Sequence, residues 1–102
     1  MHKDDVIRLR HMLDATREAL SFVAGKPRTE LDVNRMLALS LVKSIEIIGE
    51  AASKVSSHGR AQCNEVPWPD IIAMRNRLIH AYFDINLDIV WQTVTEELPR
   101  SW

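Results

Sequence analysis

One short stretch of the sequence contains most of the side chains that could perform acid–base or charge-stabilising chemistry. Arg75 is followed directly by Asn76, and His80 and Tyr82 lie five and seven residues after the arginine. Histidine binds or releases a proton near neutral pH, and the planar guanidinium of arginine matches phosphate oxygens. One histidine and one arginine would suffice to cleave RNA through its own 2′-hydroxyl. The imidazole would handle the proton, and the guanidinium would stabilise the charge that develops on phosphorus.

The same stretch also permits a purely structural interpretation. At about 100° per residue, an apolar stripe runs along the predicted helix and Arg75 falls in its middle. A guanidinium is rarely buried without a partner, and Glu46 or Glu50 could supply the carboxylate. His80 would then face solvent, and Tyr82 would pack in the core. The spacing alone leaves both interpretations open. The stripe consists of Ile71, Ile72, Leu78, Ile79 and Tyr82.

Several other chemistries have no matching pattern in the sequence. There is no glycine-rich phosphate loop, no pair of cysteines and no Gly-x-Ser-x-Gly motif. The histidines are His2, His11, His58 and His80, and none forms a His-x-x-x-His or Glu-x-x-His pair. We therefore predict no metal site and no cofactor.

Composition and length indicate a single soluble domain covering residues 1–102. The chain is 46% hydrophobic and 26% charged, which is typical of a globular protein. Its formal net charge of −1 argues against non-specific coating of nucleic acid but permits a local basic cleft. Cys63 is the only cysteine, and neither a signal peptide nor a membrane-spanning run is present. These features predict a cytoplasmic location.

The first half of the chain predicts two long amphipathic helices. The first begins near Asp4 and Asp5 and ends at Gly25–Pro27, and the second is opened by a capping box at Thr29–Asp32 and continues from 33 to 55. We expect the basic residues of the first helix to be mostly solvated; they are Arg8, Arg10, His11 and Arg17. The predicted inner stripes are Val6, Leu9, Leu13, Thr16, Leu20 and Val23, then Leu37, Leu41, Ile45, Ile48, Ala52 and Val55.

The second helix also has apolar residues away from its stripe, at Met36, Leu39 and Ile47. They predict contacts on a second side or an oligomer interface. Its narrow polar strip consists of Lys43, Glu46, Glu50 and Lys54.

A loop is predicted from Ser56 to Val66, followed by a third helix that Pro67 and Pro69 introduce and that runs to about Phe83. Asn86 is predicted to cap a fourth helix that ends at Pro99. Four main helices joined by short connections predict an all-α, up-and-down helical bundle. The inner residues of the fourth helix would be Leu87, Val90, Trp91, Val94 and Leu98.

The run from Arg75 to Tyr82 matches the R-x4-H-x-Y motif of the HepT-like ribonuclease toxins, which belong to the HEPN superfamily. The resemblance covers nearly the whole chain, because three further stretches fit the family in the same order. These are residues 45–52 (IEIIGEAA), 66–68 (VPW) and 90–99, which begins with VW and ends with ELP.

The resemblance implies a homodimer with a shared cleft and a metal-independent RNA endonuclease that is the toxin of a bacterial toxin–antitoxin pair. Arg75 and His80 would be catalytic, and Asn76 would be the supporting polar residue. Tyr82 would accept AMP from a cognate nucleotidyltransferase antitoxin, which would silence the toxin. The alternative is a non-catalytic module that docks on a nucleotidyltransferase and binds a nucleotide or that partner.

Overall fold

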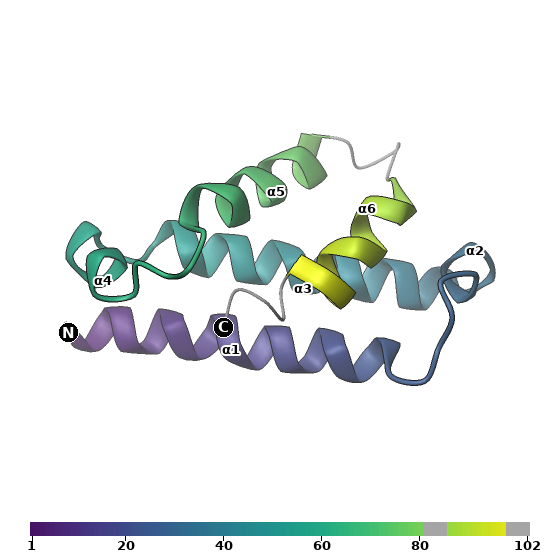
Figure 1. The fold of residues 1–102 in the computed structure, drawn as a ribbon, viewed down its shortest axis with the longest axis horizontal. Helices are drawn as coiled ribbons and strands as arrows, with labels where there is room; N and C mark the ends of the chain where they lie inside the picture. The colour runs from purple at the N-terminus through teal and green to yellow at the C-terminus, as the bar shows by residue number, and fades with distance from the viewer. Residues whose placement is uncertain (81–85, 98–102) are drawn as a thin grey trace.

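The fold is all-α, as the sequence predicts. The structure is a computed structural model that describes the backbone of residues 1–80 and 86–97 and the side chains of residues 1–76 and 86–96. Successive long helices reverse direction, so the four main segments form the predicted up-and-down bundle (Figure 1). The helices are α1 (Lys3–Val23), α2 (Glu30–Val33), α3 (Arg35–Ser53), α4 (Ser57–Gln62), α5 (Trp68–His80) and α6 (Leu87–Gln92), with a π-helical turn η1 (Thr93–Glu97).

Helix α3 is the central element of the bundle. It packs along α1 on one side and against α5 on another, and it also contacts α6 (Figure 1). The largest fully buried side chains come from α1, α3, α6 and η1, so these elements share one core. They are Met12, Leu41, Val42, Ile48, Val90 and Val94, together with Thr16. Among the described helices, none combines the length and the apolar character that crossing a membrane requires.

The inner face of α1 is partly the predicted one. Thr16 and Val23 are buried, and Leu9 and Leu20 pack against the core, but Val6 is 52% exposed. The buried face of α1 is rotated relative to the predicted stripe, since it also includes Met12, Ala15 and Ala19. The small alanine side chains allow a neighbouring helix to pack closely. At the start of the helix, Asp5 is buried and the neighbouring Val6 is not.

The inner face of α3 is the predicted one. All six residues of the predicted stripe are buried; five lie on α3, and Val55 follows two residues after its end. Its beginning differs from the prediction. Thr29 makes no capping hydrogen bond, and the one-turn helix α2 ends before Asn34. Asn34 has an extended backbone, and its side chain accepts a hydrogen bond from the Leu37 backbone N–H at 3.0 Å. The predicted capping box is therefore wrong, because Asn34 caps α3 instead.

The segment predicted as a loop, Ser56 to Val66, contains the short helix α4. Ser56 caps it by accepting a hydrogen bond from the Gly59 backbone N–H at 3.1 Å. The Asp5 carboxylate accepts hydrogen bonds from the Ser56 backbone N–H at 2.9 Å and from the Ser56 hydroxyl at 2.5 Å. These bonds join α4 to the start of α1 and explain why Asp5 is buried.

The last two main helices agree with their predicted starts. Helix α5 begins at Trp68, whose indole N–H donates to the Cys63 carbonyl at 3.1 Å. Its predicted end at Phe83 lies outside the described residues. Asn86 caps α6 by accepting hydrogen bonds from the backbone N–H groups of residues 88 and 89. Val90 and Val94 are fully buried, whereas Leu87 and Trp91 are partly buried; Leu98 and Pro99 lie outside the described residues.

Candidate functional site

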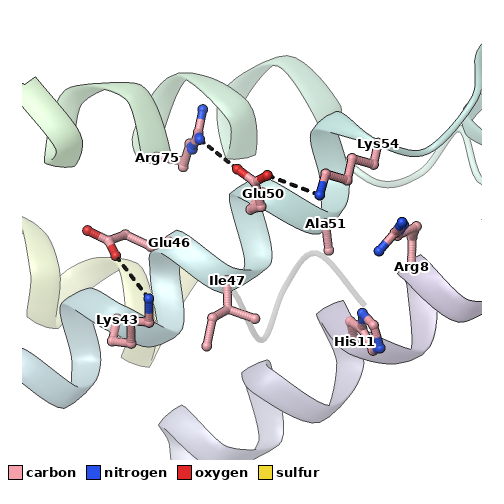
Figure 2. A pocket seen from close by; sticks show the side chains of 9 residues that line it. All are labelled: Arg8, His11, Lys43, Glu46, Ile47, Glu50, Ala51, Lys54 and Arg75. Carbon is pink, nitrogen blue, oxygen red and sulfur yellow. Dashed lines mark hydrogen bonds and ion pairs between the residues drawn. The ribbon is translucent and has the colours of Figure 1, made fainter.

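Arg75 on α5 forms an ion pair with Glu50 on α3. Its Nη2 lies 2.6 Å from Glu50 Oε2, and the two side chains are 28% and 46% exposed (Figure 2). Glu46, the other predicted partner, instead lies 3.8 Å from Lys43 Nζ. The structure therefore assigns the carboxylate partner of Arg75 to Glu50.

Gly49 allows this close contact between α3 and α5. A methyl group added at Gly49 would overlap Arg75 Cβ and lie 2.6 Å from Arg75 Cγ and 3.5 Å from its Cα. Only a residue without a side chain fits such a contact without moving one of the helices. The sequence contains one indication of this contact, because a lone glycine within a helical pattern often marks a packing site.

The other nitrogens of the Arg75 guanidinium differ in their surroundings. Nη1 donates a hydrogen bond to Oδ1 of Asn76 at 3.2 Å. Nε is buried and has no hydrogen-bond partner among the described residues. Buried donors without a partner are uncommon in folded proteins, and such a group often marks a functional position. Asn76, the next residue in the chain, therefore contacts the guanidinium through its side chain.

The remaining motif residues are only partly placed. His80 is the last residue of α5, four residues after Asn76, and its side chain lies outside the described part of the chain. Tyr82 lies outside the described residues as well.

Glu50 has a second cation partner. Lys54 Nζ lies 3.2 Å from Glu50 Oε1, so Lys54 and Arg75 each face a different oxygen of the carboxylate (Figure 2). The hydrogen bond from Lys54 and the positive charge of Arg75 hold the pKa of Glu50 below its ordinary value. Glu50 is therefore a carboxylate at neutral pH, and it fixes the position of two cations.

A pocket of about 340 Å³ adjoins this ion pair (Figure 2). It lies between α1 and α3 and extends to Arg75 on α5. Arg8 and His11 line it; His11 is exposed, as predicted, and Arg8 is partly exposed. The remaining lining residues come from α3 and its C-cap, Lys54: Lys43, Glu46, Ile47, Glu50, Ala51 and Lys54.

The pocket has more basic than acidic groups. Four permanent cations and one histidine line it, against two carboxylates, and each carboxylate has a cation within 4 Å. Within the described part of the chain, no cluster of three or more His, Cys, Asp or Glu side chains could hold a metal ion. The surplus of basic groups suits the pocket to an anion.

Comparison with known proteins gives one consistent family. The family model described as "Ribonuclease HepT-like" matches residues 12–101. A protein of Caldanaerobacter subterraneus subsp. tengcongensis named "Putative RNase" is 35% identical over 92 residues, which cover 90% of this chain and 82% of that protein. A protein of Methanocaldococcus jannaschii with the same description is 32% identical over 101 residues, covering 98% of this chain and 93% of its own.

A third relative has a more specific name. The "Probable ribonuclease HepT" of Thermococcus cleftensis is 37% identical over 60 residues, or 59% of this chain and 54% of that protein. No solved structure matches the chain.

Proposed function

The chain belongs to the HepT-like ribonuclease family, and we propose that it is a metal-independent RNA endonuclease whose catalytic residues are Arg75 and His80. One observation supports this most directly. Arg75 is held between Glu50 and Asn76 while its side chain keeps 28% exposure, and His80 ends the same helix five residues later. A fixed but accessible guanidinium is suited to bind a phosphate that arrives from solvent.

The proposed reaction uses the 2′-hydroxyl of the RNA as the nucleophile. Its oxygen forms a bond to phosphorus, and the bond from phosphorus to the 5′-oxygen of the next nucleotide breaks. An imidazole accepts the proton of the 2′-hydroxyl, and a proton is delivered to the leaving 5′-oxygen. Arg75 stabilises the negative charge that builds on the phosphoryl oxygens. The products are a 2′,3′-cyclic phosphate and a 5′-hydroxyl.

A homodimer would suit this reaction, because it needs a base and an acid while each chain has one motif histidine. Two-fold symmetry would bring two copies of His80 to a shared cleft, one deprotonated and one protonated. Exposed apolar side chains on α3 that lie outside the pocket support such an association: Met36 is 81% exposed, and Leu39 is 39% exposed. We therefore propose that the active form is a homodimer.

The test is cleavage of a labelled RNA by the purified protein in the presence of EDTA. We expect wild-type cleavage to yield cyclic phosphate ends and to stop when the attacking 2′-hydroxyl is replaced by hydrogen. Arg75→Ala should lower the rate by about 10²–10³-fold, as loss of a charge-stabilising donor does. His80→Ala should lower it by about 10²–10⁴-fold. Thermal melting of each variant controls for folding.

Cleavage that persists unchanged in both variants, or that EDTA abolishes, would contradict this assignment. Absence of cleavage together with a stable complex with a nucleotidyltransferase would support the non-catalytic binding module instead.

We propose further that the protein is the toxin of a toxin–antitoxin pair and that its cognate nucleotidyltransferase transfers AMP to Tyr82. An adenylyl group two residues from His80 would add charge and bulk next to the catalytic pair. The intact mass after co-expression with the transferase should rise by one AMP, and Tyr82→Phe should remove this increase. An equal increase in the variant would place the acceptor elsewhere.

A further inference from the structure

The pocket between α1 and α3 contains basic side chains that the proposed catalytic pair does not use. We propose that this groove, with Arg8, His11 and Lys54 along it, binds backbone phosphates of the RNA strand next to the bond that is cleaved. The inference rests on the proposed ribonuclease function and assigns a second, non-catalytic part of its substrate site.

The groove has a surplus of positive charge, because four lysine and arginine side chains line it against two carboxylates. Glu46 is engaged by Lys43, and Glu50 is engaged by Lys54 and Arg75. Arg8 lines the pocket but forms neither an ion pair nor a hydrogen bond through its side chain with any described residue. An arginine directed into a pocket without a carboxylate partner is a site for an external anion, and its planar donors suit phosphate oxygens.

Arg8 and His11 lie on the side of α1 that faces α3. Their side chains project from α1, one helical turn apart, on the side of the groove opposite Lys54 and Ala51 (Figure 2). Arg8 is only partly exposed and lines the pocket. A ligand in the groove would therefore meet cations from two helices.

The length of the groove favours a chain of phosphates over a single anion. Its basic residues along α3 and at its C-cap extend from Lys43 to Lys54, eleven residues apart, which is about 16 Å along a helix. Between them, Ile47 and Ala51 add apolar lining, and the charges of Glu46 and Glu50 are offset by their ion pairs. A lining that combines cations with apolar side chains matches a nucleic acid strand, which alternates charged phosphates with the less polar faces of sugar and base.

The groove is continuous with the proposed catalytic arginine. Lys54, Glu50 and Arg75 form a chain of contacts of 3.2 and 2.6 Å across the end of the pocket. An RNA strand whose scissile phosphate binds Arg75 could thus extend over Lys54 toward Arg8 and His11. These residues would contribute to RNA affinity without taking part in bond cleavage.

Binding of a non-cleavable strand tests the groove independently of catalysis. The probe is a fluorescently labelled, fully 2′-O-methylated oligoribonucleotide, with its dissociation constant measured by anisotropy over a series of salt concentrations. Arg8→Gln should weaken binding several-fold and reduce the slope of log affinity against log salt by about 0.7, the value for one phosphate contact on a single strand. Arg10→Gln is the matched control, because Arg10 is exposed on the same helix and does not line the pocket.

Kinetics distinguish this groove from the catalytic pair. Arg8→Gln should raise the KM for a long RNA several-fold with little change in kcat, and it should leave cleavage of a dinucleotide unchanged, because a dinucleotide has no flanking phosphate. If Arg8→Gln keeps the wild-type RNA affinity and salt slope, the proposal is wrong. This holds even if the variant has lost binding to the nucleotidyltransferase, because Arg8 would then serve that partner and not RNA. If wild-type protein binds the oligonucleotide through Arg8 but cleaves no RNA, the groove stands and the proposed ribonuclease function fails.

Discussion

Replacing Gly49 with alanine should destabilise the protein, although alanine is the better helix former. Ala is favoured over Gly by about 1 kcal/mol in a helix interior, so the local effect alone would stabilise α3. The packing effect has the opposite sign. The new methyl group would overlap Arg75 Cβ, which is fixed to the backbone of α5 and cannot rotate away. Relief therefore requires the two helices to move apart.

The net effect can be estimated from these two contributions. Overpacking a core contact costs typically about 1–3 kcal/mol, and an overlap with a backbone-attached atom belongs at the upper end. After the gain in helix propensity is subtracted, we expect a net loss of about 2 kcal/mol in the free energy of unfolding. For a domain of this size each kcal/mol corresponds to about 4–8 °C, so the melting temperature should fall by roughly 8–16 °C.

The assay is thermal and urea unfolding monitored by circular dichroism, with RNA cleavage measured at a temperature where each variant is folded. Gly25→Ala is the control glycine substitution. Gly25 has a φ of 73° and nothing within 4 Å of an added methyl group, so it should lose stability through backbone strain alone. Only Gly49→Ala should also reduce cleavage, since it displaces Arg75. A Gly49→Ala protein as stable as wild type would refute the packing argument.

Three further predictions concern the ends of the helices. Asn86→Ala should lower the free energy of unfolding by about 1 kcal/mol and the melting temperature by about 4–8 °C, because two N–H groups of α6 lose their acceptor. Asn86→Ser should retain most of the stability. An unchanged melting temperature in Asn86→Ala would contradict this. Ser56→Ala should cost about 0.5–2 kcal/mol through loss of the α4 cap, measured as a lower urea midpoint, and a wild-type midpoint would speak against it. Hydrogen bonds from the Ser56 hydroxyl and backbone N–H lower the pKa of Asp5. The ionised carboxylate therefore contributes its full stability above the unfolded pKa of about 3.9. This contribution disappears as the pH falls through the lower pKa of the folded state. Urea midpoints between pH 6 and 2.5 should therefore fall less steeply in Ser56→Ala than in wild type, and parallel profiles would exclude this role of Asp5.

Periodicity predicts long helices well and short ones poorly in this chain. The inner stripe of α3 was correct at every residue because it consists almost entirely of Leu, Ile and Val, which dominate a hydrophobic pattern. On α1 the stripe was only partly correct, since buried alanines carry little weight in a hydrophobic pattern. The six-residue helix α4 was missed. Its cap is joined to Asp5, 51 residues away, and no local pattern reports such a contact.

The sequence predicted a carboxylate partner for Arg75 but left open which of two glutamates supplies it. Glu46 and Glu50 lie one turn apart on the same side of α3, so their spacing presents both toward a neighbouring helix. The choice depends on where α5 crosses α3. Gly49 fixes that point, because the absent side chain lets Arg75 approach there. Arg8 and His11 were not foreseen as pocket residues, since their position follows from how α1 packs against α3.

The two cations on Glu50 resolve the apparent conflict between a structural ion pair and a catalytic arginine. If Glu50 had only Arg75 as a partner, binding of a phosphate to Arg75 would leave an uncompensated carboxylate beside the substrate. Lys54 already contacts the other oxygen of Glu50, so the carboxylate keeps a cation when the arginine turns to a phosphate. Both side chains are also partly exposed, and ion pairs at such positions contribute little stability, so exchanging the partner costs little. The contact that orients Arg75 in the free protein is therefore compatible with its proposed role on RNA.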